Sequence, residues 1–284
     1  AVATGKIIDD DVIVPAMPAL TPSVVHSYNI YNGATYKDGG TGQYGISDPS
    51  GLAYIPSLGR MFVADSEHDE SPFLSPTNLF SLKLDGTYDT NYGLNSFTKE
   101  PTGLAYNPNN GYLYIADDDK YAVSWVSPTN PTVRLGSFDT RQLGYLDTED
   151  LKIDPLTGHI HQLDGTLKQM IELTDQGAFV NAVPLAGFTT DAEALAYDPV
   201  HDLYFVASGA SKLIWIIDAQ GNVEATIDIF SSGYSGMKIK GLEYAPSSDP
   251  NDGNTMSLYV ADYHSDQTND GHLYEVHLGT NWFG

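Results

Sequence analysis

Cysteine is absent from the sequence, which excludes a disulfide framework and thiol chemistry. Basic residues are scarce: 13 lysines and arginines stand against 37 aspartates and glutamates, so the net charge is −24. So acidic a chain lacks the basic patches with which proteins bind nucleic acid or anionic membranes. There is also no apolar run of about 18 residues, so we expect no transmembrane helix. Divalent cations, cationic partners or a salty medium suit such a surface.

Aromatic side chains and turn-forming residues are abundant instead. Nineteen tyrosines, ten phenylalanines and three tryptophans favour strands over helices, while 27 glycines and 16 prolines supply turns. An apolar fraction of 41% is enough for a hydrophobic core. A length of 284 residues accommodates one large all-β domain or two small ones.

A nine-residue pattern recurs five times along the chain. Its copies, DPSGLAYIP, EPTGLAYNP, DTEDLKIDP, DAEALAYDP and KIKGLEYAP, start at residues 48, 100, 147, 191 and 238, at intervals of 52, 47, 44 and 47. Repeats of this length indicate an array of one supersecondary unit. Each copy is followed by a second and a third strand-like segment, and most units add a fourth, such as 132–138, 179–185 and 223–229. Four antiparallel strands per unit, arranged radially, predict an all-β fold, a five-bladed β-propeller.

The two ends of the repeat array predict how the ring closes. The fifth unit has only three strand candidates, and residues 23–31 form a strand candidate that has no unit of its own. We expect 23–31 to complete the last blade, which leaves no free sheet edge between the chain ends. Residues 23–284 are then a single propeller domain, and residues 1–22, with three consecutive aspartates and three prolines, form an extended arm. A β-sandwich with chance internal similarity is the alternative.

The propeller topology predicts one acidic face. The start of the first strand and the end of the second strand of a blade share a face, and the strand starts bring six acids there: Asp48, Glu100, Asp147, Glu149, Asp191 and Glu193. Loops after the second strands add further acids, among them Glu67, Asp118, Asp164, Asp262 and Asp266. Like charges at ~4 Å repel by roughly 1 kcal/mol in water and by more in a drier site. A bound cation relieves this repulsion, and oxygen ligands favour Ca²⁺ before Mg²⁺. A solvated acidic face without metal is the alternative.

Individual residues on this face are candidates for specific roles. Glu149 and Glu193 occupy equivalent positions and are the best ligand candidates, while Lys240 in the same column is able to pair with one of them. His68 and His264 lie in corresponding loops of the first and fifth blades, which are neighbours in a closed ring. A histidine beside carboxylates is a candidate general base with a raised pKa. An exposed loop histidine is the alternative for each.

The fourth unit carries a family resemblance. Residues 191–199, followed by 203–208 and 213–221, resemble a blade of the SdiA-regulated (YjiK-like) propellers, and are also similar to phytase-like esterase, NHL and gluconolactonase-like propellers. The resemblance extends over roughly residues 48–278. In the gluconolactonase and phosphotriesterase relatives, a Glu before the inner-strand Gly ligates catalytic Ca²⁺, so the resemblance implies a Ca²⁺ site at Glu149 and Glu193. Asp150 and Ala194 replace that Gly in this chain.

Two functions of different classes follow. The first is a calcium-dependent hydrolase of ester, lactone or phosphoester bonds, in which the cation polarises the scissile oxygen and His264 or His68 moves a proton. The second is a non-catalytic extracellular propeller that binds a protein or glycan partner, with Ca²⁺ stabilising the ring. A chain from a salty habitat with no metal role is a third reading. We expect a small-molecule or cationic ligand at the channel mouth, a monomer, and a secreted or periplasmic location.

Overall fold

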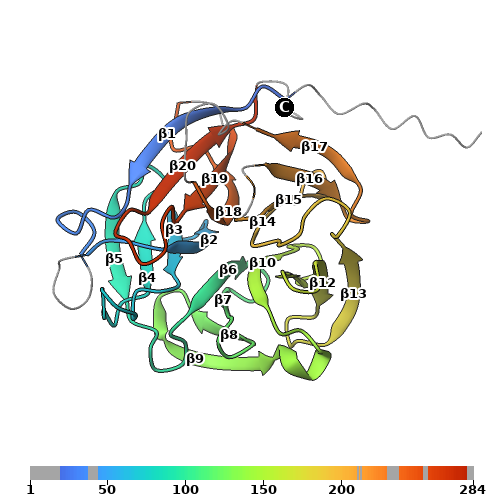
Figure 1. Cartoon of the computed structure of the whole chain (residues 1–284), viewed down its shortest axis with the longest axis horizontal. Coiled ribbons are helices and arrows are strands. Elements are labelled where there is room, and N and C mark those ends of the chain that lie inside the picture. The colour runs from blue at the N-terminus through green and yellow to red at the C-terminus, as the bar shows by residue number, and fades with distance from the viewer. Residues whose placement is uncertain are drawn as a thin grey trace, which may run out of the picture.

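The computed structural model describes residues 20–37, 44–209, 211, 213–228, 237–251 and 255–279. Over these residues the chain forms five four-stranded antiparallel sheets and a single-turn 3-10 helix, η1 (Thr140–Leu143). Figure 1 shows the five sheets arranged radially around one axis. The predicted five-bladed β-propeller is confirmed. The predicted arm at 1–22 lies, up to residue 19, outside the described residues, and none of the described helices is long and apolar enough to span a membrane.

Four of the blades take their strands in chain order from the axis outward. Blade one contains β2 (Pro49–Ile55), β3 (Arg60–Asp65), β4 (Leu79–Leu82) and β5 (Tyr88–Tyr92). Blade two contains β6 (Pro101–Asn107), β7 (Tyr112–Asp117), β8 (Ala122–Ser127) and β9 (Asn130–Asp139). Blade three contains β10 (Thr148–Ile153), β11 (Ile160–Asp164), β12 (Gln169–Leu173) and β13 (Phe179–Pro184). Blade four contains β14 (Ala194–Asp198), β15 (Leu203–Ala207), β16 (Ile214–Asp218) and β17 (Val223–Ile227).

Blade five closes the ring with strands from both ends of the sequence. Its inner strands are β18 (Ile239–Pro246), β19 (Met256–Asp262) and β20 (His272–His277), and its outer strand is β1 (Ser23–Asn29). β1 pairs antiparallel with β20 (Figure 1). In this pairing Val24 lies opposite Val276 and Tyr28 lies opposite Leu273. The prediction that the strand near 23–31 completes the last blade is therefore confirmed.

The hydrophobic core lies between neighbouring blades rather than at the axis. One core cluster, for example, joins Leu52, Met61 and Phe80 of blade one to Tyr259 and Leu273 of blade five, all of them fully buried. Each sheet presents apolar side chains on both faces because each face packs against another blade. The alternation of the repeat thus serves packing, and burial of this apolar surface is the main favourable term in folding.

The five inner strands contact one another in a ring, in the order β2, β6, β10, β14, β18 and back to β2. Glycines allow the closest approaches in this ring. A Cβ on Gly103 would lie 2.7 Å from Asp150 Cα, and a Cβ on Gly241 would overlap the backbone oxygen of Ser50. The glycine column of the repeat is therefore explained by backbone-to-backbone packing around the axis.

Candidate functional site: an acidic cavity at one mouth of the channel

A cavity of about 120 Å³ lies at the end of the axis where the inner strands begin. Blades one, two, three and five contribute its walls. Six carboxylates and one ammonium group line it, together with four hydroxyl groups: Asp48, Glu67, Glu100, Asp118, Glu149 and Asp266; Lys240; and Ser50, Ser66, Thr102 and Tyr263. The predicted shared face, formed by strand-one starts and the loops after strand two, is present.

β-Bulges aim several of these side chains at the cavity. The register of the inner strand shifts against its neighbour between Pro49 and Leu52, and again between Pro101 and Gly103. Matching shifts fall in β10 and β18, so the unpaired positions include Ser50, Thr102, Glu149 and Lys240. A bulged residue is released from the pleat and points away from its usual face. The third position of the repeat, which holds the predicted ligand Glu149, is thus the position at which these four inner strands bulge.

Asp48 is the most unusual member of the cavity. It is only 2% exposed, and neither of its carboxylate oxygens has a hydrogen-bond partner among the described residues. Burial, followed by the nearby charges of Asp65 and Glu67, raises its pKa to about 9. A buried carboxyl group normally has hydrogen-bond partners, because leaving it unsatisfied costs about 1–3 kcal/mol. Asp48 therefore marks a position where the fold leaves two oxygens free for a ligand.

Two further pairs of acids meet at the rim of the cavity. Glu67 shares a hydrogen bond with Asp266 of blade five, and burial together with this contact raises the pKa of Glu67 to about 8. Glu100 pairs in the same way with Asp119, and burial and the Asp119 charge raise its pKa to about 8. Two carboxyl groups this close do not readily lose both protons, because the charge of one favours the neutral form of the other. The cavity therefore retains protons at neutral pH in the absence of a cation.

Lys240 lines the cavity, and its ion pair is with Glu193. Its Nζ lies 3.3 Å from Oε1 of Glu193, whose Oε2 accepts a hydrogen bond of 2.8 Å from the backbone N–H of Gly209. The charges of Glu149 and Glu193 raise the pKa of Lys240 despite its burial, so it is a permanent cation. Burial raises the pKa of Glu149 well above its usual range, although Lys240 opposes this. The expected pairing of Lys240 with one of the two glutamates is observed, and Lys240 is the single basic residue among the described residues that line the cavity.

The six predicted metal ligands separate into two groups. Asp48, Glu100 and Glu149 line the cavity, whereas Glu193, Asp147 and Asp191 do not. Oδ2 of Asp147 accepts hydrogen bonds from the backbone N–H and Oγ1 of Thr166, at 2.6 and 2.7 Å, and so holds a turn. Oδ1 of Asp191 lies beside Gly165, as does the carboxylate of Asp147. Both predicted ligands that precede β14, Asp191 and Glu193, thus lie outside the cavity lining, as does Asp147 before β10.

Neither predicted catalytic histidine lines the cavity. His68 is fully buried; its Nδ1 lies 2.6 Å from the carbonyl oxygen of Thr77, and its ring packs against Phe73 and Phe80. Nε2 of His68 has no hydrogen-bond partner among the residues that the structure describes. His264 adopts a left-handed backbone conformation with φ 56°, and its N–H donates to Oδ1 of Asp262 at 2.9 Å. A proton-transfer role for either histidine stays a prediction.

The donor set of the cavity matches a hard cation in kind. Carboxylate and hydroxyl oxygens are the ligands that Ca²⁺ and Mg²⁺ prefer, and Asp48 offers two carboxylate oxygens that no described residue hydrogen-bonds. Within the described part of the chain, however, no three His, Asp or Glu side chains are already gathered as a ligand set. Cation binding here requires side chains to move toward the ion.

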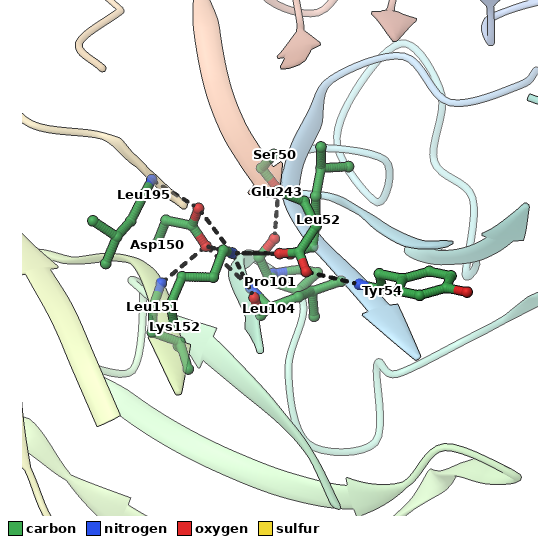
Figure 2. A network of polar contacts seen from close by, with 10 residues as sticks. All are labelled: Ser50, Leu52, Tyr54, Pro101, Leu104, Asp150, Leu151, Lys152, Leu195 and Glu243. Carbon is green, nitrogen blue, oxygen red and sulfur yellow. Dashed lines mark hydrogen bonds and ion pairs between the residues drawn. The ribbon is translucent and has the colours of Figure 1, made fainter. Parts of the chain in front are cut away.

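A second set of charged residues, which the sequence pattern does not predict, lies in the channel further along the axis from the acidic cavity. Figure 2 shows Lys152 at its centre: Nζ donates hydrogen bonds of 2.9 Å to the carbonyl oxygens of Leu52 and Leu104, and lies 3.2 Å from Oδ1 of Asp150 and 3.5 Å from Oε2 of Glu243. Burial raises the pKa of Asp150 to about 6 and that of Glu243 to about 7. The signal was present in the repeat: three copies have Ala at this position, and Lys152 and Glu243 occupy the other two.

Comparisons with known proteins support the fold and go no further. No protein-family model matches the chain, and no curated protein matches it. The chain is similar to a solved nidogen/laminin complex, with 14% identity over 75% of this chain and 72% of that one and a TM-score of 0.51. It is also similar to a protein of unknown function from Bacteroides thetaiotaomicron, with 13% identity over 79% of this chain and a TM-score of 0.50, and spans 58% of that protein's length.

At such identities these likenesses show the architecture alone. The chain is a β-propeller of five four-stranded blades, with an acidic cavity at one mouth of its channel. Membership of the SdiA-regulated, NHL or gluconolactonase-like families stays a prediction.

Proposed function

We propose that this propeller is a binding module that holds a hard divalent cation, Ca²⁺ before Mg²⁺, in the acidic cavity. The observation that carries the proposal is Asp48, whose two buried carboxylate oxygens have no hydrogen-bond partner in the described part of the chain. Asp48, Glu67 and Glu100 would supply the charged ligands, with Ser50 and Thr102 as neutral oxygen donors. The cation would displace the protons that these acids retain.

The position of Lys240 favours this side of the cavity over the ligand pair suggested by family resemblance. Lys240 already neutralises Glu193 and lies near Glu149, so a second cation between those glutamates would meet its charge. Asp48, Glu67 and Glu100, three acids with raised pKa values, line the same cavity, and within the described part of the chain none of them forms an ion pair with a lysine or arginine. Removing this repulsion is the source of the proposed binding energy.

Binding without turnover is the simpler conclusion, because the two candidate proton carriers do not line the cavity. A bound cation would tie blade one to blade two and so stabilise the ring. It would also present a charged surface to a protein or glycan partner, in keeping with a secreted or periplasmic protein.

The test compares thermal unfolding and calorimetric titration with CaCl₂ and MgCl₂ at pH 7.5, against NaCl at equal ionic strength. We expect Ca²⁺ to raise Tm beyond the salt control, and Asp48→Asn or Glu67→Gln to remove the extra rise. Glu224→Gln, an exposed acid on β17, is the matched control and should behave as the wild type. Equal stabilisation by NaCl and CaCl₂ would contradict the proposal and favour a purely salt-adapted surface.

The same preparation tests hydrolysis. A panel of esters, lactones and phosphoesters is assayed with Ca²⁺ and with EDTA. EDTA-sensitive turnover that is lost in the Glu149→Gln, Glu193→Gln double variant would make the protein a hydrolase and overturn the non-catalytic part of the proposal. Absence of turnover together with calcium-dependent stabilisation is the result that we expect.

A further inference from the structure

The opposite end of the channel carries a second cavity, of about 380 Å³, where the inner strands end. The seventh position of four repeat copies contributes an aromatic ring to its wall: Tyr54, Tyr106, Tyr197 and Tyr244. The proline that ends each copy lines it as well. We call this cavity the axial funnel. Its volume lies within the range of about 300–1,000 Å³ that is usual for small-molecule sites.

The floor of the axial funnel is charged, unlike its walls. Lys152 and Glu243 both line it, and Asp150 contacts Lys152, with Oδ1 3.2 Å from Nζ (Figure 2). The three protons of the Lys152 ammonium group are engaged by the carbonyl oxygens of Leu52 and Leu104 and by Asp150.

The negative charge of Glu243 is therefore only partly compensated by Lys152. Its Oε1 accepts a hydrogen bond of 3.2 Å from the backbone N–H of Tyr54, and its Oε2 lies 3.5 Å from Lys152 Nζ. We call Lys152, Asp150 and Glu243 the buried triad. The Glu243 side chain is 15% exposed, the largest exposure of the three. Two carboxylates against one ammonium group leave the floor with one negative charge when both are ionised.

Aromatic walls above a carboxylate define the chemistry of the ligand. Tyrosine faces attract cations through the ring quadrupole, and aromatic cages are used to recognise quaternary ammonium groups. A metal ion would prefer more oxygen donors than these walls offer, an anion would meet the negative floor, and a sugar would find few polar side chains. We propose that the axial funnel binds an organic ammonium ion, with its charged head toward Glu243 and its alkyl or ring body against the tyrosines.

This site is independent of the acidic cavity, because Lys152 and its partners occupy the channel between them. The two sites also differ in the cation that they suit. The mouth offers oxygen ligands and little apolar surface, whereas the axial funnel offers aromatic and proline surface around one carboxylate.

Choline is the probe for the test, and 3,3-dimethylbutanol is its neutral counterpart of the same shape. Binding to the full chain is measured by calorimetry and by ligand-observed NMR at pH 8. We expect choline to bind and dimethylbutanol to bind at least about tenfold more weakly. Glu243→Gln should reduce choline affinity at least about tenfold, as expected for the loss of a charged partner.

Two further variants keep the test decisive if Glu243→Gln alters folding. Tyr106→Leu removes a ring and should weaken choline binding, whereas Tyr106→Phe keeps the ring and should not. Asp48→Asn, at the other mouth, should leave choline binding unchanged. Absence of choline binding, equal affinity for the neutral alcohol, or loss of binding in Asp48→Asn but not in Glu243→Gln would each overturn the proposal.

Discussion

The protonation state of Asp48 makes the stability of the metal-free protein depend on pH. Burial raises the pKa of this carboxyl group from 3.8 to about 9. Between these two values the unfolded chain has lost the proton that the folded chain retains, so unfolding releases a proton. Stability is therefore greatest below about pH 4 for this group and falls as the pH rises toward 9, with a slope of about 1.4 kcal/mol per pH unit.

From pH 6 to pH 8, Asp48 alone should lower the free energy of unfolding by about 2.7 kcal/mol, twice that slope. Asp48→Asn removes the titrating group but keeps its shape, so the loss between pH 6 and pH 8 should shrink by about that amount. Glu67 and Glu100 act in the same direction up to about pH 8, so part of the wild-type loss should remain in the variant.

The assay is equilibrium urea unfolding in EDTA at several pH values, with Glu224→Gln as the control. An unchanged pH dependence in Asp48→Asn would refute the assignment of a proton to Asp48. A wild-type stability that rises from pH 6 to pH 8 would refute the account of the whole cavity.

Three other predictions concern packing and charge. Lys240→Met leaves Glu149 and Glu193 without their cation and should lower the free energy of unfolding by about 3 kcal/mol at pH 8. The loss should be smaller at pH 5, where these acids take up protons. An equal loss at both pH values in urea unfolding would contradict this prediction. Gly103→Ala forces a Cβ against the backbone of Asp150 and should lower the free energy of unfolding by about 1–3 kcal/mol. Gly187→Ala is the control: its added Cβ would meet no described atom within 4 Å, so the same measurement should show little effect. Val24→Asp, which places a charge against the core beneath the closing strand, should lower Tm clearly, while Val25→Asp beside it, 37% exposed in the wild type, should not.

The architecture was predictable because packing imposes it on every blade. Each sheet must bury both faces against its neighbours, so the same apolar alternation recurs in all five units and the count of blades follows from the repeat. The unpaired strand candidate at 23–31 similarly predicted the closure of blade five, because a three-stranded last blade would leave an edge.

The composition of the site was only partly predictable, because local backbone geometry decides which acids converge. Glu149 and Glu193 occupy the same repeat position, but β10 has a bulge there and β14 begins only at Ala194. Glu149 consequently lines the cavity, while Glu193 pairs with Lys240 and Gly209. Nothing in the residue types distinguishes the two cases.

The buried triad illustrates a different limit. Lys152 and Glu243 are far apart in sequence and break the alanine column in separate copies. Their departure from the pattern signals a special position, but their contact depends on how far β10 and β18 reach toward the axis. The sequence therefore indicates that this repeat position is unusual, and the geometry of the ring determines which residues are in contact there.

The pairing of β1 with β20 also constrains how the molecule comes into being. A ribosome releases residues 23–29 early, yet their hydrogen-bonding partners at 272–277 emerge some 250 residues later. Blades one to four hold all of their strands in order and are able to form as they are synthesised, whereas blade five is completed only after β20 has left the ribosome. Until then β1 is a strand without a partner, and because long-range pairing of this kind is slow, the final step of folding should be its capture by β20.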